Sequence, residues 1–182
     1  MQGNFSNVRI RHYTLAVLIG LLATTRAMAA DDAITWSLQT PAGTTVNFPD
    51  ERNGPAILLF WASWCPYCKA LMPHLQTMAD EYEGELTIYA INFRDDDDPQ
   101  AFMQQNGYTF TLLLSGGAVA EQYEIWGTPG VLVFDQNNRQ ILNLYDVVTE
   151  VDAELAATEG LSHRDKAARK APAWAAAIEA AL

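Results

Sequence analysis

The 182-residue sequence has little cysteine, histidine and positive charge, and each shortage excludes a class of function. With two cysteines and three histidines, no second ligand pair stands at the spacing that a structural zinc site needs. Lysine and arginine number 11 against 22 acidic residues, and the formal net charge of −11 disfavours contact with nucleic acid. We therefore expect no metal, no other cofactor and no nucleic-acid partner.

The two cysteines, Cys65 and Cys68, form a C-x-x-C motif, which leaves no cysteine for a structural disulfide elsewhere. A disulfide within the motif would close a very short loop, so it would remove little chain entropy and stabilise little. A copper-carrying dithiol is an open alternative, although no histidine stands where it would complete that site. The pattern favours a redox-active dithiol.

The motif follows the apolar run 56–61, which predicts a buried strand that leads into a helix. Pro66 then takes the first helical position, where a missing N–H costs nothing, and Cys65 takes the N-cap. Free N–H groups and the positive end of the helix dipole favour a thiolate there. We expect Cys65 to be exposed at the helix start and to attack a substrate, while Cys68, one turn inside and covered, resolves the mixed disulfide.

The first 29 residues have the pattern of a secretory signal peptide: a basic start, an apolar stretch at 13–23 and an A-x-A cleavage pattern at 27–29. The apolar stretch is too short for an ordinary membrane span, although an uncleaved membrane anchor is an alternative. We expect residues 1–29 to be removed and residues 30–182 to form one domain in a bacterial periplasm.

Hydrophobic patterns predict a mixed α/β sheet covered by helices. Residues 34–38 and 45–48 alternate around a turn and predict an N-terminal hairpin. Further strands are expected at 56–61, 86–93, 110–114, 131–134 and 141–145, with helices at 66–82, 99–106 and 118–125.

Two polar or helix-breaking patterns mark the ends of helices. The acidic run 95–98 precedes Pro99 and lacks the spaced ligands of a calcium loop, so we expect it to cap the helix 99–106. The alanine-rich tail, about 149–182, predicts one helix ended by Gly160 and another opened by a Ser162–Asp165 capping box. Pro172 should break or restart that second helix.

The strand, the W-x-x-W-C-P-Y-C-K motif at 61–69 and the Gly-Thr-Pro at 127–129 together resemble a thioredoxin-fold protein. The signal peptide, the hairpin and the helical insertion make the chain similar to the exported TlpA/ResA type of thiol-disulfide oxidoreductase. The resemblance covers about residues 34–145. It implies a thioredoxin-like mixed sheet flanked by helices, with an N-terminal β-hairpin, to which this chain adds extra C-terminal helices.

The resemblance also assigns roles to individual residues. Cys65 becomes the nucleophile, Cys68 the resolving cysteine, and Pro129 a cis-proline that faces the dithiol. The backbone of Thr128 would pair with an extended client strand. The remaining client-binding positions are Trp64, Pro66 and Tyr67.

The chain departs from this family at the expected proton acceptors. Leu59 and Leu71 stand where carboxylates are expected, and Ala90 stands where a lysine would accompany the first of them. Because aliphatic neighbours desolvate the sulfur, we expect the pKa of Cys68 to be raised. The group that deprotonates Cys68 is left open.

By this resemblance the chain is a periplasmic thiol-disulfide reductase that exchanges its CPYC dithiol with client disulfides. A membrane electron donor would keep it reduced, and apocytochrome c is one possible client. The Pro66–Tyr67 dipeptide indicates an intermediate reduction potential, so a disulfide oxidase or isomerase stays open. A metallochaperone or a redox-inert binding module on the same fold is the alternative from another class.

Overall fold

The computed structural model describes residues 34–50, 52, 54–148 and 160–182. The predicted signal peptide and the first predicted helix of the tail lie outside these residues. Within the described part of the chain, no helix combines the length and the apolar character that a membrane crossing requires.

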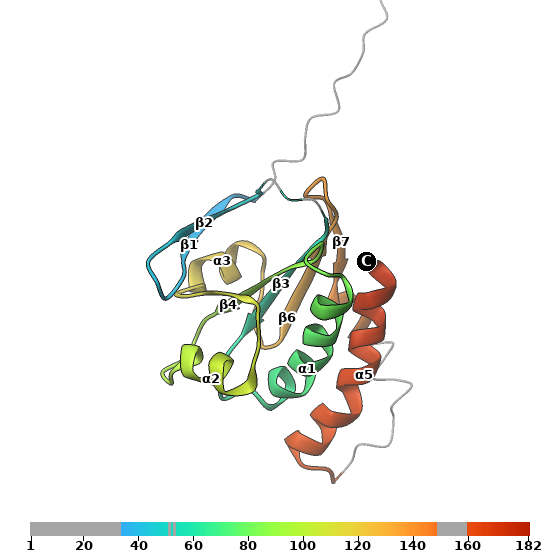
Figure 1. Cartoon of the computed structure of the whole chain (residues 1–182). Helices are drawn as coiled ribbons and strands as arrows, with labels where there is room; N and C mark the ends of the chain where they lie inside the picture. Colours follow the sequence, from blue (N-terminus) through green and yellow to red (C-terminus); the bar gives the residue numbers. More distant parts are fainter. Residues whose placement is uncertain (1–33, 51, 53, 149–159) are drawn as a thin grey trace, which may run out of the picture. The chain divides into compact units, whose positions relative to one another are not determined.

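A five-stranded mixed sheet lies at the centre of the domain (Figure 1), in the order β5-β4-β3-β6-β7. Strands β3, β4 and β5 are parallel to one another, whereas β6 is antiparallel to β3 and to β7. The sheet comprises β3 (Ala56–Trp61), β4 (Thr87–Asn92), β5 (Thr111–Leu113), β6 (Gly130–Phe134) and β7 (Gln140–Asn143). Strands β1 (Trp36–Gln39) and β2 (Thr45–Phe48) form a separate antiparallel hairpin, as predicted.

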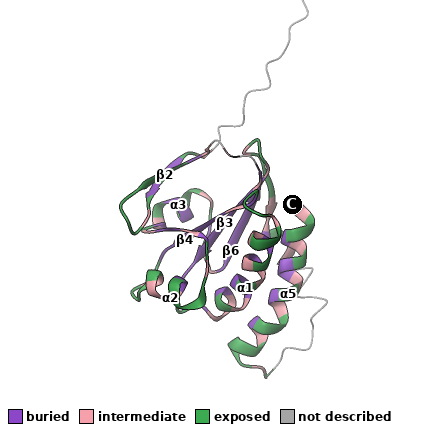
Figure 2. Cartoon of the chain, in the orientation of Figure 1, coloured by how far each residue is buried: buried purple, intermediate pink, exposed green. Residues whose placement is uncertain are grey.

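Helices and the hairpin bury both faces of the sheet. Successive residues of a strand point to opposite sides, so residues 57, 59 and 61 of β3 join one apolar cluster and residues 56, 58 and 60 join the other. Helices α1 (Pro66–Glu81) and α5 (His163–Ala181) pack together over the first cluster, while the hairpin and α3 (Gly117–Gln122) cover the second (Figures 1 and 2). The predicted fold class is therefore confirmed.

Helix α5 runs through Pro172 without interruption, so the predicted break is wrong. A proline inside a helix removes one backbone hydrogen bond. Apolar residues on both sides of it, among them Ala171, Trp174 and Ile178, are buried in the cluster shared with α1. This packing holds the helix together. The predicted start is confirmed, because the Ser162 hydroxyl accepts the N–H of Asp165 at 3.2 Å.

Strand β7 ends two residues earlier than predicted. Residues 144–148 are helical, because the Asn143 side chain accepts the N–H of Tyr145 at 3.0 Å and so acts as a helix cap. This local cap outweighs the apolar pattern that had predicted a strand up to Tyr145.

Candidate active site

The dithiol lies where β3 leads into α1. Cys65 is the N-cap of α1 and Pro66 its first residue, as predicted. The sulfur of Cys65 accepts the N–H of Cys68 at 3.2 Å, and its thiol donates to the carbonyl of Thr128 at 3.4 Å. The helix terminus and the Thr128 loop thus meet at this sulfur.

Both cysteines are buried, with exposed fractions of 1% for Cys65 and 0% for Cys68. The expectation that Cys65 is exposed is therefore wrong. A position at the start of a helix does not leave it open, because Thr128 lies across its sulfur. The two sulfurs differ in the polarity of their surroundings rather than in the exposure of their residues.

The surroundings shift the two thiols in opposite directions. A hydrogen bond with the Cys68 side chain, together with backbone N–H groups at the helix start, lowers the pKa of Cys65 to about 6 despite the opposing effect of burial. Burial raises the pKa of Cys68 well above its usual value, and the neighbouring Cys65 raises it further. Near neutral pH, Cys65 is therefore largely a thiolate and Cys68 a neutral thiol.

The apolar surroundings of Cys68 include the two leucines that stand where the resemblance implies carboxylates. Leu59 and Leu71 are fully buried in the same cluster as Cys68, so aliphatic side chains occupy both positions expected to hold carboxylates. Leu59 pairs with Ala90 across β3 and β4, so the two positions that the resemblance assigns to an acid and its lysine companion lie side by side. The prediction that desolvation raises the pKa of Cys68 is confirmed in direction.

The loop that carries Thr128 is fixed at both ends. The Thr128–Pro129 peptide bond is cis. A Cβ on Gly130 would lie 2.5 Å from Ile125 Cγ2, so only glycine fits where β6 begins. At the other end, the Tyr145 hydroxyl donates to the Gly127 carbonyl at 2.6 Å and accepts the Gly127 N–H at 3.0 Å. Sequence reasoning missed this role of Tyr145, because a contact over 18 residues has no local signal.

Asp95 is a second residue that the sequence did not reveal. Its carboxylate accepts the Ser63 N–H at 2.6 Å, the Ser63 hydroxyl at 2.9 Å and the Asn92 amide at 2.7 Å. Although burial opposes it, these bonds lower the pKa of Asp95 below its usual value. Asp95 thus holds the loop just before Cys65.

The acidic run as a whole had been predicted to cap helix α2 (Pro99–Asn106). Only part of that prediction holds. Asp98 is the cap, since its carboxylate accepts the N–H of Ala101 at 2.9 Å. Asp95 points instead to the buried Ser63 and Asn92, whose polar groups require partners.

The remaining predicted client-binding residues lie in different settings. Trp64 is 53% exposed, and its indole N–H donates to the carbonyl of Arg94 at 2.8 Å. Tyr67 is half-buried and turns toward α5, where its ring lies 5.9 Å from that of Trp174 and its hydroxyl 3.5 Å from His163 Nδ1. The tail therefore covers one side of the dithiol motif.

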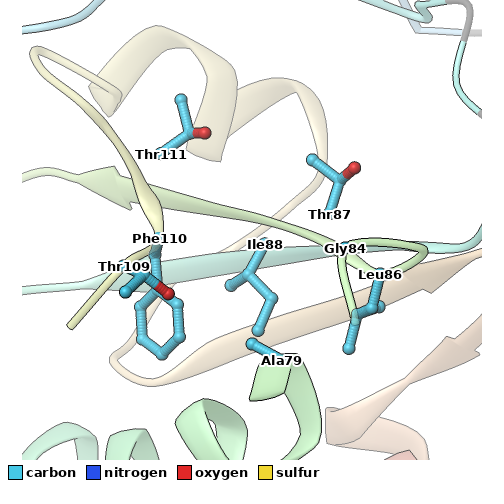
Figure 3. Close-up of a pocket in the computed structure, with 8 residues that line it drawn as sticks. All are labelled: Ala79, Gly84, Leu86, Thr87, Ile88, Thr109, Phe110 and Thr111. Atoms are coloured by element: carbon cyan, nitrogen blue, oxygen red, sulfur yellow. The ribbon is translucent and has the colours of Figure 1, made fainter. Parts of the chain in front are cut away.

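The structure also contains a hollow of about 370 Å³, which Figure 3 shows in close-up. Its lining is Ala79, Gly84, Leu86, Thr87, Ile88, Thr109, Phe110 and Thr111. It borders the first residue of β4, whereas Cys65 follows the last residue of the parallel strand β3. Because it contains none of the predicted site residues, we do not place the active site there. Across the described residues, no three histidine, cysteine or acidic side chains gather as metal ligands would.

Comparison with known proteins identifies relatives of this chain. It is 27% identical over 105 residues to the thioredoxin-like protein YneN of Bacillus subtilis, and 25% identical over 114 residues to the thiol-disulfide oxidoreductase ResA of Halalkalibacterium halodurans. These matches cover 56% and 61% of this chain, and 62% and 65% of the relatives, so each spans less than two thirds of the relative.

Solved structures show the same fold. A secreted disulfide oxidoreductase of Mycobacterium tuberculosis, homologous to DsbE of Escherichia coli, superposes with a TM-score of 0.54 at 23% identity. The match covers 79% of this chain and 99% of that structure. The model of the AhpC/TSA family matches residues 29–152, which contain the whole sheet and the dithiol but not α5. The presence of ResA among the relatives agrees with the resemblance to the TlpA/ResA type. The chain belongs to the AhpC/TSA family.

Proposed function

We propose that this protein is a thiol-disulfide reductase in which Cys65 attacks client disulfides and Cys68 completes the exchange. The observation that carries the proposal is the geometry of the dithiol: the Cys65 sulfur accepts the Cys68 N–H at the start of α1, whereas Cys68 lies in the apolar cluster. These surroundings lower the pKa of Cys65 and raise that of Cys68. The thiolate is the nucleophile in disulfide exchange, so the nucleophile is Cys65. The name of its relative ResA, a thiol-disulfide oxidoreductase, supports this chemistry.

The exchange proceeds in two balanced steps. The Cys65 thiolate attacks one sulfur of the client disulfide, the client S–S bond breaks, and the second client sulfur leaves as a thiolate that takes up a proton. Cys68 then loses its proton and attacks the Cys65 sulfur of the mixed disulfide, the bond between Cys65 and the client breaks, and the client sulfur leaves as a thiolate that takes up a proton. The client leaves with two thiols, reduced by two electrons, and the protein retains a Cys65–Cys68 disulfide.

The residues around Cys65 would bind the client. The backbone carbonyl of Thr128 lies 3.4 Å from the Cys65 sulfur. There the Thr128 backbone would pair with the backbone of an extended client segment. Pro129, Trp64 and Pro66 would complete the surface that binds the client. Tyr67 would contact the client from the position in which its ring packs against Trp174 of α5.

The predicted signal peptide, and the secreted disulfide oxidoreductase among the similar structures, support a periplasmic location. In that compartment a membrane electron donor would return two electrons to the Cys65–Cys68 disulfide. Exported proteins with paired cysteines, apocytochrome c among them, would be the clients.

The reduction potential of the dithiol tests the direction of exchange. A Cys65 pKa of about 6 lies between the values of about 7 for thioredoxin and about 3.5 for DsbA, and nearer to that of thioredoxin. We therefore expect a potential in the lower part of the range from about −270 mV for thioredoxin to about −120 mV for DsbA, below about −180 mV. Equilibration of the chain with glutathione buffers, followed by tryptophan fluorescence, measures it, and the double variant Cys65→Ser with Cys68→Ser is the control that should show no transition. A potential near about −120 mV would identify an oxidase instead.

A further inference from the structure

Two tryptophans stand exposed beside the dithiol and are joined by one arginine. The exposed large apolar side chains of the described residues are Trp64, at 53%, Trp126, at 74%, and Ile141, at 40%. The Trp64 indole donates to the Arg94 carbonyl at 2.8 Å, and Arg94 Nη1 donates to the Trp126 carbonyl at 3.1 Å. Arg94 therefore ties the loop before Cys65 to the loop that leads into Thr128.

Trp126 is held in a fixed position although it is exposed. Its ring stacks on Tyr145 with a centroid distance of 4.8 Å and an interplanar angle of 26°. Tyr145 is itself anchored through its hydroxyl to Gly127, the residue after Trp126. A large aromatic side chain that is already ordered loses little conformational entropy on binding, and such side chains often supply much of the energy of an interface.

The position of Trp126 relative to the reacting sulfur defines what it would contact. Trp126 precedes Thr128 by two residues, and the Thr128 carbonyl lies 3.4 Å from Cys65 Sγ. An extended client advances about 3.3 Å per residue, so a residue next to the client cysteine comes within side-chain reach of this loop. The chain's net charge of −11 gives no attraction for an acidic client segment, whereas the exposed indole offers apolar area.

We propose that Trp126, together with Arg94 and Trp64, forms a docking surface for the client segment that contains the reacting cysteine, and that it selects segments with an apolar side chain beside that cysteine. This inference rests on the proposed thiol-disulfide exchange. It adds a specificity-determining residue, Trp126, that the dithiol motif does not contain.

The test uses two synthetic peptides, each closed by an intramolecular disulfide, that are identical except for leucine or serine beside both cysteines. The reduced protein should react about fivefold faster with the leucine peptide, as expected when an apolar side chain is partly buried in the encounter. Trp126→Ala should bring the two rates close together, and Trp126→Phe, which keeps an aromatic ring on Tyr145, should retain most of the difference.

Ile141→Ala is the matched control. Ile141 is also exposed, but it lies on β7 beside the end of β6 that pairs with the first residue of β3, away from Cys65. This variant should keep the preference of the wild type. Equal rates for the two peptides in the wild type, an unchanged preference in folded Trp126→Ala, or an equal loss in Ile141→Ala would overturn the docking surface. If neither peptide nor oxidised glutathione reacted, the proposed function itself would fail.

Discussion

The surroundings of Cys65 and Cys68 differ more than a separation of three residues suggests. Around Cys65 lie backbone N–H groups at the start of α1, among them those of Cys68 and Tyr67, which favour a negative charge. Around Cys68 lies the apolar cluster that contains Leu59 and Leu71. Both residues are buried, so exposure does not separate them. What stabilises or destabilises a negative charge at each sulfur decides its role.

This contrast gives the two steps of exchange different pH dependences. The lowered pKa of Cys65, about 6, means that its thiolate is present above that pH and is lost as the pH falls through it. The raised pKa of Cys68 means that its thiolate appears only at alkaline pH. Attack on the client should therefore be fast and flat from neutral pH upward, whereas resolution should accelerate as the pH rises.

Removal of either sulfur should produce the largest effect. Cys68→Ser should accumulate mixed disulfides between Cys65 and its clients, because attack proceeds and resolution cannot. Cys65→Ser should accumulate none, because the remaining thiol of Cys68 is neutral near pH 7 and the thiolate is the form that attacks a disulfide. Non-reducing electrophoresis of each variant after incubation with a disulfide-containing client measures this. Trapping through Cys68, or equal trapping by the two variants, would contradict the assignment of roles.

A carboxylate placed on the apolar side should reduce the contrast. Leu71→Glu should speed resolution near pH 7 by at least about tenfold, a modest value for a general base, because the new carboxylate can take the Cys68 proton. It should also lower the free energy of unfolding, since a lone carboxylate is costly to bury in this fully apolar position. Single-turnover release of client from the Cys65 mixed disulfide measures the rate.

Leu71→Gln is the control for this change, because it has a similar size and polarity but no basic group. It should leave resolution slow near neutral pH. A wild-type rate that is already fast and independent of pH would show that a different group removes the Cys68 proton.

Loss of the Asp95 carboxylate should change the polar surroundings of Cys65, with a smaller effect on reactivity than the changes above. Asp95→Asn replaces one of the two carboxylate oxygens that accept the Ser63 N–H and hydroxyl by an NH2 group, which cannot accept, and should lower the free energy of unfolding by about 1–3 kcal/mol. A looser helix N-cap should also raise the pKa of Cys65 by about half a unit, so alkylation of Cys65 should slow about threefold near pH 5 and by less than about 1.5-fold near neutral pH. Alkylation kinetics and denaturant unfolding measure the two effects.

Asp96→Asn makes the same charge change on an exposed residue of the same acidic run. It should change stability by less than about 0.5 kcal/mol. Equal effects of the two variants would show that charge, not the bonds to Ser63, matters.

The stability that Asp95 adds should also depend on pH. Hydrogen bonds lower the folded pKa of Asp95, so its contribution to the free energy of unfolding should be present above the unfolded value of about 3.9 and lost as the pH falls through the folded value.

The sequence predicted the parts of this site whose causes are local. A helix start at Pro66 and the apolar runs of the strands depend on neighbouring residues, so the N-cap position of Cys65 and the mixed sheet followed from the pattern. Resemblance to a known family added Leu59 and Leu71 as aliphatic replacements, and their burial agrees with it.

Contacts between distant segments were beyond reach from the sequence. Asp95 and Tyr145 lie 32 and 18 residues from the groups they hold, and nothing in the local pattern distinguishes them from a capping acid or a strand residue. The predicted break at Pro172 was wrong for the opposite reason. Proline does remove a hydrogen bond from the helix, but packing of α5 on α1 outweighs this loss. The burial of Cys65 depends on Thr128, another distant neighbour.

An ultraviolet titration of thiolate absorbance in the fully reduced protein tests the central contrast most directly. One thiolate should appear with a midpoint near pH 6, the second only at strongly alkaline pH, and Cys65→Ser should lack the first step. Two thiolates that appear together near the ordinary cysteine value of about 8.5 would contradict the division of roles between Cys65 and Cys68.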